Sequence, residues 1–443
     1  MKFAPRFLRH LNVKFAQRFV RSLARLRERV GERETGAAGF IIRGNVPCIP
    51  VEMAKEVCSA PFLRYAPGPI LLTVFLALNG CSADKPPEWA GVKDEAAKLV
   101  EFTEKAKFEA RQIGSAGNPG ENLLHPATAK DAIFVVSGNG RLARFDIATD
   151  REVWRIESEI KVSGGVGSGE GLVLIGSNKG DVLAYGENGT LRWKSRVSSE
   201  VLSAPQVAEG VVIVRSGDGR IAGLSAADGK RLWVYERSTP ALVVRSHAGV
   251  TIQRGVVYAG FAGGKLVAID INNGTVLWET SVSQPRGNTE LERISDITSN
   301  PVVDDEQVCA IAFQGRVACY EIAQGSPLWN REFSSDKGMT LLRKYLYLSD
   351  ANGSVMVLDK TSGSTLWKND QLHMRGTTAP AVQANFVVVG DYEGYLHGLN
   401  REDGTYVARI KLEGGAIKVV PVQMGDGLLV QTQSGELYLL SIH

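Results

Sequence analysis

The stretch "KLVAIDINNGTVLW", residues 265–278, contains two short apolar runs separated by a polar turn. Its turn, Asn272-Asn273-Gly274, consists of residue types that tolerate the positive φ angles of a tight hairpin. The stretch therefore predicts two antiparallel strands, the second of which carries Trp278. Similar stretches return along most of the chain, so the repeat decides the fold.

Eight copies of this unit follow one another, and each is preceded by a glycine. These glycines are Gly140, Gly180, Gly219, Gly264, Gly315, Gly353, Gly394 and Gly435, at intervals of 40, 39, 45, 51, 38, 41 and 41 residues. A period near 40 with four short strands per unit is typical of a β-propeller, whose blades cannot bury their faces alone.

Each copy also repeats two apolar positions, and six of the eight copies add a tryptophan. Leu266 and Ile269 illustrate the apolar pair, whose offset of three directs the side chains to opposite faces of a strand. Both faces of each sheet must then be covered. Tryptophan follows on the second strand in six copies, at Trp154, Trp193, Trp233, Trp278, Trp329 and Trp367. The sequence predicts an all-β fold, an eight-bladed β-propeller of four-stranded antiparallel blades.

The last blade needs a strand from elsewhere, because the eighth copy ends at His443, before its tryptophan strand. Trp89, in "PPEWAGV", is the one tryptophan outside the repeats, and it precedes the first copy. We expect an N-terminal strand near Trp89 to complete the last blade and close the ring. Closure removes two exposed sheet edges.

The N-terminal part of the chain differs from the repeats in charge. Residues 1–80 hold 13 Lys and Arg against 5 Glu, a balance of +8, so with the whole chain at +3 the remainder is at −5. A mildly acidic body argues against nucleic-acid binding. Residues 1–52 are interpreted either as an extension from a start codon assigned too early or as a basic arm for a membrane surface.

An apolar run lies in "PILLTVFLALNGC", residues 69–81. It is too short to cross a bilayer and has the length of a signal-peptide core. The run resembles a bacterial lipoprotein signal, in which Cys81 would be acylated after cleavage, although Asn79 departs from the usual small or apolar residue. The predicted organisation is a start-site extension (1–52), a signal peptide (53–80), a lipidated linker with the ring-closing strand (81–130) and the propeller repeats (131–443).

Chemistry-bearing residues are sparse. The six histidines form no pair at metal-ligand spacing, and no Gly-x-Ser-x-Gly motif occurs. The glycine-rich "SGGVGSGEG", residues 163–171, lacks the following helix that a phosphate site needs, so we expect a loop between blades. Cys309 and Cys319 flank the turn "FQGR" and could form a disulfide or remain two small buried thiols. The sequence predicts no catalytic residue, no metal and no cofactor.

Two resemblances bear on function. Repeats such as "LSAADGKRLW", residues 224–233, resemble those of quinoprotein dehydrogenases, which are eight-bladed propellers that bind pyrroloquinoline quinone and calcium. A dehydrogenase is therefore the alternative, although the adjacent cysteine pair common in those enzymes is absent. Repeat type indicates a fold and not an activity.

The stretches at 290–303, 387–408 and 428–440, together with the signal, are similar to the BamB family. BamB proteins are lipoprotein subunits of the outer-membrane β-barrel assembly machinery. This resemblance implies a non-catalytic scaffold, anchored by lipid at Cys81 to the periplasmic face of the outer membrane. It also implies binding to the POTRA domains of BamA and help to unfolded outer-membrane protein clients.

The two longest repeat intervals are consecutive, so their insertions, 238–250 and 283–301, lie on neighbouring blades. Insertions in repeat proteins often form the binding face. These loops hold Leu242, Val244, Arg245, Glu292, Arg293 and Asp296.

Apolar residues with an arginine inside a polar rim suit a modest protein interface. The resemblance implies BamA contacts at Leu242, Val244, Arg245 and Asp296, whereas Thr298 replaces a second acidic residue of the family pattern. Solvated loop charges with apolar residues tucked beneath them are the alternative.

Overall fold

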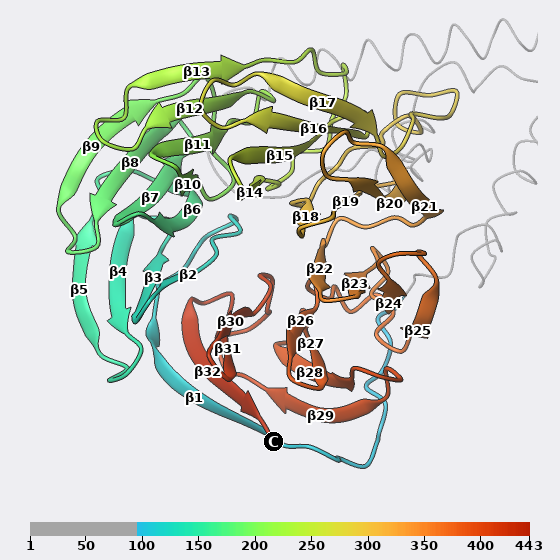
Figure 1. Cartoon of the computed structure of the whole chain (residues 1–443). Coiled ribbons are helices and arrows are strands. Elements are labelled where there is room, and N and C mark those ends of the chain that lie inside the picture. The colour runs from blue at the N-terminus through green and yellow to red at the C-terminus, as the bar shows by residue number, and fades with distance from the viewer. Residues whose placement is uncertain (1–94) are drawn as a thin grey trace, which may run out of the picture. The chain divides into compact units, whose positions relative to one another are not determined.

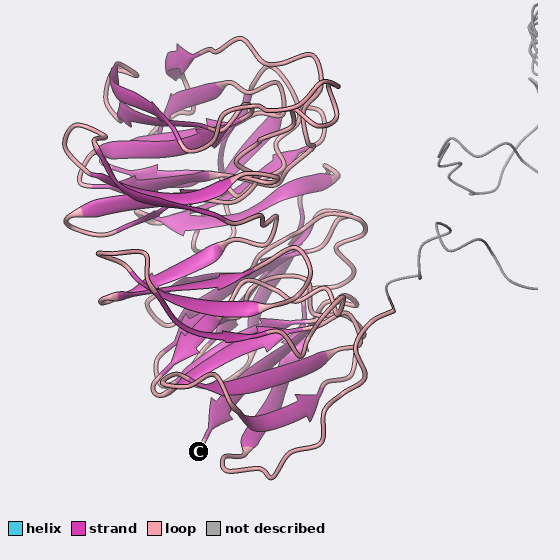
Figure 2. Cartoon of the chain, turned by 90° about the vertical axis from the view of Figure 1, so that its right-hand side faces the viewer, coloured by secondary structure: helices cyan, strands magenta, loops and turns pink. Residues whose placement is uncertain are grey.

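The computed structural model describes residues 95–443. Its strands form eight four-stranded antiparallel sheets around a central axis (Figure 1). This part of the chain consists of strands and loops alone (Figure 2). The predicted fold, an all-β propeller with eight blades of four strands, is confirmed.

The strands follow in chain order, and in blades 1 to 7 the first strand of each lies nearest the axis (Figure 1). Blade 1 has β2 (Ala127–Ala129), β3 (Ala132–Val136), β4 (Arg141–Asp146) and β5 (Glu152–Glu157). Blade 2 has β6 (Val162–Gly169), β7 (Leu172–Ser177), β8 (Asp181–Gly186) and β9 (Leu191–Arg196). Blade 3 has β10 (Gln206–Ala208), β11 (Val211–Arg215), β12 (Ile221–Ser225) and β13 (Arg231–Tyr235). Blade 4 has β14 (Val250–Gln253), β15 (Val256–Phe261), β16 (Lys265–Asp270) and β17 (Val276–Ser281).

The second half of the ring continues the same pattern. Blade 5 has β18 (Val302–Val303), β19 (Gln307–Ile311), β20 (Arg316–Glu321) and β21 (Pro327–Glu332). Blade 6 has β22 (Met339–Leu342), β23 (Tyr345–Ser349), β24 (Val355–Asp359) and β25 (Thr365–Asn369). Blade 7 has β26 (Ala381–Gln383), β27 (Phe386–Gly390), β28 (Tyr395–Asn400) and β29 (Tyr406–Lys411). Blade 8 has β30 (Val422–Met424), β31 (Gly427–Gln431), β32 (Glu436–Ile442) and, outermost, β1 (Phe108–Ser115).

The hydrophobic core consists of eight apolar layers, one between each pair of neighbouring blades. Strand β3 shows how a single strand serves two layers. Ile133 and Val135 pack toward blade 8, whereas Phe134 and Val136 pack toward blade 2. All four side chains are buried. Alternation along the strand therefore covers both faces of the sheet, and stability comes from contacts between blades.

Tryptophans on the outer strands of blades 1 to 6 join each of these blades to the next. The Trp233 indole donates from Nε1 to the carbonyl oxygen of Ile271 at 2.8 Å. Its ring also covers Gly274, where a Cβ would lie 2.7 Å from the indole and φ is 75°. A side chain at this position would therefore clash and be strained. The same indole bond to the following blade recurs at Trp154, Trp193, Trp278, Trp329 and Trp367.

Strand β1 supplies the fourth strand of blade 8. It pairs with β32 in antiparallel register, from Phe108 opposite Ile442 to Ser115 opposite Glu436. It occupies the outer position that a tryptophan strand has in blades 1 to 6 (Figure 1). The strand lies further along the chain than the segment around Trp89 where we expected it, and Trp89 is outside the described residues. Backbone pairing with β32 selects this segment, although it carries no tryptophan.

The glycine-rich stretch at 163–171 is not the loop that we expected. Most of it forms β6, the inner strand of blade 2. A Cβ on Gly164 would lie 2.5 Å from the carbonyl oxygen of Ser203, and one on Gly167 would lie 1.8 Å from that of Pro205. The glycines are needed because the backbones of adjacent blades approach closely near the axis.

Two further sequence predictions concern the pair Cys309 and Cys319 and the N-terminal segments before the propeller. Cys309 and Cys319 lie opposite each other on β19 and β20, with a Cα–Cα distance of 4.1 Å, and a disulfide joins them. The start-site extension, the signal peptide and Cys81 lie outside the described residues. Residues 95–443 contain no apolar helix of membrane-spanning length.

Residues 95–107, the N-terminal strap, run along the outside of blade 7 before β1 begins (Figure 1). The Ala97 N–H donates to the carbonyl oxygen of His373 at 2.8 Å, which attaches the strap to the loop between blades 6 and 7. Phe102 stacks on Tyr406 with ring centroids 5.3 Å apart. The strap and β1 together therefore bind blades 7 and 8 from outside.

A buried polar network lies beneath this strap. Arg375 donates from Nε to Asp391 Oδ2 at 2.8 Å, and His397 Nε2 lies 2.9 Å from the same oxygen. Arg409 donates from Nε to His397 Nδ1 at 3.1 Å. Because arginine can only donate, Nδ1 must carry the lone pair, and Nε2–H donates to Asp391. His397 is thus neutral, in agreement with a pKa that burial lowers.

Candidate partner-docking surface

Two insertion loops lie side by side on one face of the propeller. The first, residues 236–249, connects β13 to β14, and the second, residues 282–301, connects β17 to β18. The Gly249 N–H donates to Asn300 Oδ1 at 2.6 Å. The Thr251 hydroxyl, just beyond the first loop, donates to the carbonyl oxygen of Pro301 at 2.6 Å. Neighbouring blades therefore place both predicted insertions on one surface.

Asp296 is the centre of this junction. Its Oδ2 accepts the Val244 N–H at 2.7 Å, and its Oδ1 accepts the Gly263 N–H of the β15–β16 turn at 2.9 Å. The side chain is 4% exposed. Hydrogen bonds to a carboxylate are stronger than neutral ones, so Asp296 fixes the two loops to each other and to blade 4.

The first insertion loop presents its apolar residues to solvent. Leu242 and Val243 are 41% and 40% exposed. Arg245 is exposed beside them, and Val244 is partly buried between them. Exposed aliphatic side chains with an adjacent arginine form the kind of surface that protein interfaces use at their centre.

Glu292 and Arg293 serve the internal structure of the second insertion loop. The Glu292 carboxylate accepts the Thr289 N–H at 3.2 Å, and the Thr289 hydroxyl accepts the Glu292 N–H at 3.2 Å. This reciprocal pair is a capping box, which orders a single helical turn. Arg293 donates to the carbonyl oxygen of Gly287 at 3.1 Å. Glu292 also borders a separate pocket with Arg316, away from the residues that surround Asp296.

The structure thus brings Leu242, Val244, Arg245 and Asp296 together and adds residues that the sequence analysis missed. Val243 is exposed in the same loop, and Arg215, at the end of β11, lines the pocket beneath it. The repeat pattern itself could have pointed to Arg215. The position four residues before the repeat glycine holds, in order, Val136, Gly176, Arg215, Gly260, Ile311, Ser349, Gly390 and Gln431. Arg215 is the one charged residue in that series.

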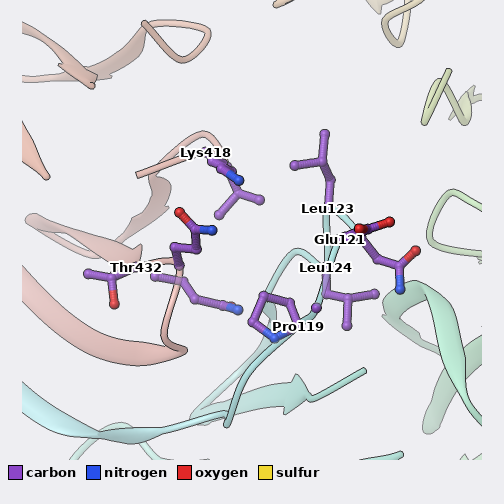
Figure 3. A pocket seen from close by; sticks show the side chains of 11 residues that line it. Pro119, Glu121, Leu123, Leu124, Lys418 and Thr432 are labelled. Atoms are coloured by element: carbon purple, nitrogen blue, oxygen red, sulfur yellow. The ribbon is translucent and has the colours of Figure 1, made fainter. Parts of the chain in front are cut away.

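A cavity of about 800 Å³ lies between the inner strands and contains His125 and His247 in its lining. A second, smaller pocket lies between the chain that leads into β2 and the loops of blade 8, with Pro119, Leu123, Lys418 and Thr432 around it (Figure 3). Its volume of about 20 Å³ suits roughly one water molecule. Within residues 95–443, no group of three or more His, Cys, Asp or Glu side chains is arranged to hold a metal ion.

Acidification is expected to destabilise the propeller partly through His125. Burial, with a smaller contribution from nearby His247, lowers the pKa of His125 from 6.5 to about 4. The unfolded chain therefore binds this proton first, so the stability due to neutral His125 is present above pH 6.5 and is lost as pH falls toward 4. The His125→Asn variant should show a smaller decrease in unfolding temperature over that interval. Replacement of exposed His373 by Asn is the control, and equal slopes for wild type and His125→Asn would contradict the assignment.

Eight four-stranded blades, six of them linked to the next by a tryptophan, and two joined insertion loops define a β-propeller of the quinoprotein-like repeat class. The family model for "Outer membrane protein assembly factor BamB" matches residues 138–369 and 351–443. The chain belongs to the BamB family. A relative from Nitrosomonas eutropha that carries the same family name is 46% identical over 318 residues, which cover 72% of this chain and 78% of the relative.

Solved structures agree with this assignment. The crystal structure of BamB from Moraxella catarrhalis matches with a TM-score of 0.69 and 26% identity, over 75% of this chain and 100% of that one. A europium-containing methanol dehydrogenase matches with a TM-score of 0.62 and 11% identity, over 74% of this chain and 84% of the enzyme. At that identity the likeness shows the fold alone. The family match supports the assembly-factor interpretation over the dehydrogenase alternative.

Proposed function

We propose that this chain is a non-catalytic scaffold of the outer-membrane β-barrel assembly complex. It binds the periplasmic POTRA domains of BamA through the two insertion loops and assists the folding and insertion of outer-membrane proteins. A lipid on Cys81 anchors it to the periplasmic face of the outer membrane. Unfolded outer-membrane proteins are its clients, and they reach the insertase because the scaffold holds the POTRA domains in place.

The observation that carries this proposal is the joining of the two insertion loops at Asp296. This carboxylate takes backbone N–H groups from the first loop and from the β15–β16 turn. It therefore holds Leu242, Val243 and Arg245 in one fixed arrangement on the surface. A preorganised surface loses little conformational entropy when it binds a partner. Among the residues implied by the resemblance, Asp296 then acts by positioning the loop, and Leu242 and Arg245 supply direct contacts.

Charge reversal at Arg245 tests the proposal. In the full chain, the Arg245→Glu variant is expected to bind purified BamA POTRA domains at least 30-fold more weakly than wild type, in line with the roughly 2 kcal/mol lost at a central interface residue. The Leu242→Asp variant should lose binding to a similar extent, because it places a charge at the apolar centre of the surface. Titration calorimetry or biolayer interferometry gives both affinities.

A matched control is available on another blade. Leu366, on the outer strand β25, is 47% exposed, close to the 41% of Leu242, but it belongs to blade 6, whereas the insertion loops connect blades 3, 4 and 5 (Figure 1). The Leu366→Asp variant should retain wild-type affinity. Undiminished binding by both Arg245→Glu and Leu242→Asp would show that the POTRA domains dock elsewhere.

A further inference from the structure

A pocket of about 260 Å³ opens between the two insertion loops. The first loop contributes Val243, Val244 and Arg245 to its lining, and the second contributes Asp296. Arg215 reaches it from the end of β11 in blade 3. The pocket therefore lies directly beneath the exposed residues of the candidate docking surface.

Arg215 is held firmly but is not fully hydrogen-bonded. Its Nη1 donates to the carbonyl oxygen of Gly249 at 3.2 Å, and its guanidinium lies over the Phe261 ring, 5.1 Å from the centroid. Among the residues that the structure describes, the guanidinium makes no other hydrogen bond. A guanidinium has five N–H donors, so most of its capacity remains for a ligand. Burial lowers the pKa of Arg215 to about 10, and the group is still charged at neutral pH.

The carboxylates that line the pocket, Asp296 and Glu200, accept hydrogen bonds from other groups and not from Arg215. Asp296 attracts the guanidinium, but both of its oxygens accept backbone N–H groups. Glu200, which also lines the pocket, accepts the hydroxyl of Ser199. Among the described residues, neither of these carboxylates forms a hydrogen bond with Arg215. A partly desolvated cation without a paired carboxylate is costly, and a carboxylate that binds through two oxygens removes that cost.

We infer that this pocket receives an aspartate or glutamate side chain of the docking partner. Arg215 would donate two parallel hydrogen bonds to the two oxygens of that carboxylate. Exposed Arg245 at the rim adds a second positive charge, and Val243 shields the contact from water. This inference rests on the proposed function, because it takes the partner to be the POTRA domains. It adds to that function a specificity-determining residue outside the insertion loops.

The test is a double-mutant cycle between the full chain and POTRA domains. The Arg215→Met variant keeps an unbranched apolar stem over Phe261 and removes the donors, and it is expected to bind at least tenfold more weakly. A panel of single Asp→Asn and Glu→Gln changes in the POTRA domains is then measured against both proteins. One of these changes should weaken binding to wild type but have no further effect on Arg215→Met, because the two losses report the same contact.

Control variants separate the outcomes. Arg331→Met, on β21, also removes an arginine that donates to a glycine carbonyl, here that of Gly363 at 2.6 Å, and should bind normally. Arg215→Lys keeps the charge but not the fork and should lose affinity by a smaller factor; it replaces Arg215→Met in the cycle if that variant unfolds. The pocket assignment alone would be overturned if the Arg215 variant bound the POTRA domains with wild-type affinity. It would also be overturned if every change in the panel weakened binding to that variant as much as binding to wild type. Failure of the wild-type chain to bind POTRA domains would overturn the proposed function with it.

Discussion

Replacement of Asp391 by alanine is expected to lower the free energy of unfolding by about 3–5 kcal/mol, since it leaves buried Arg375 with the partly exposed Glu393 as its one carboxylate partner and removes the acceptor of His397. Asp391 is 0% exposed and Arg375 is 3% exposed. Burial alone would raise the pKa of Asp391, but the hydrogen bonds from His397 and from the Tyr395 N–H, together with Arg375, lower it. The carboxylate is therefore charged and integral to the network.

The preceding blade provides a matched control. Asp350 stands at the same place in its repeat, and its Oδ1 accepts the N–H groups of Asn352 and Ser354 just as Asp391 Oδ1 accepts those of Glu393 and Tyr395. Asp350→Ala thus removes the same turn contacts without disturbing a buried network, and it should cost only about 1–2 kcal/mol. Urea denaturation gives both values. Equal losses for the two variants would mean that the network contributes nothing beyond the turn.

The double variant Phe108→Ala and Ile113→Ala is expected to prevent stable folding. Phe108 packs into the layer between blades 7 and 8, and Ile113 packs into the layer between blades 8 and 1. The first truncation costs about 3–5 kcal/mol and the second about 2–5 kcal/mol. The two sites lie in separate layers, so their effects should add. The sum approaches the roughly 5–15 kcal/mol that stabilises a whole domain.

The neighbouring exposed residues of β1 give the control for this prediction. Arg111 and Gln112 are exposed and take part in surface contacts with Asp150 and Glu436. The double variant Arg111→Ala and Gln112→Ala should therefore lose no more than about 1 kcal/mol. Thermal unfolding followed by circular dichroism compares the two. If the Phe108 and Ile113 variant unfolds at the wild-type temperature, β1 does not close the ring.

The repeat made the architecture predictable because the blades share one local sequence pattern, which forms the same strands and turns each time. The glycine columns, the apolar pairs and the tryptophans together specified eight blades and their order. The insertion loops were also predictable, since a longer interval between repeats has to add residues to a connection. That both loops meet on one face follows from their equivalent positions on neighbouring blades.

Other features depend on contacts that a repeat does not encode. The glycines of β6 resembled a loop, because the sequence of this segment does not show that the backbone at Ser203 and Pro205, from the chain leading into another blade, approaches it closely. Strand β1 lacks a tryptophan, so the sequence pattern favoured the segment around Trp89 instead. The sequence suggested that Asp296 is an exposed contact residue. In the structure it is buried, and it accepts a hydrogen bond from Val244, which lies 52 residues away in sequence. Arg215 could be noticed only as the charged residue in an otherwise uncharged column.

Hydrogen exchange of the full chain, with and without BamA POTRA domains, tests the central claim most directly. The account predicts slower exchange of backbone amides in residues 236–249 and 282–301, with little change in the outer strands β21, β25 and β29. Protection confined to those outer strands or to the axial cavity, with the insertion loops unchanged, would contradict it.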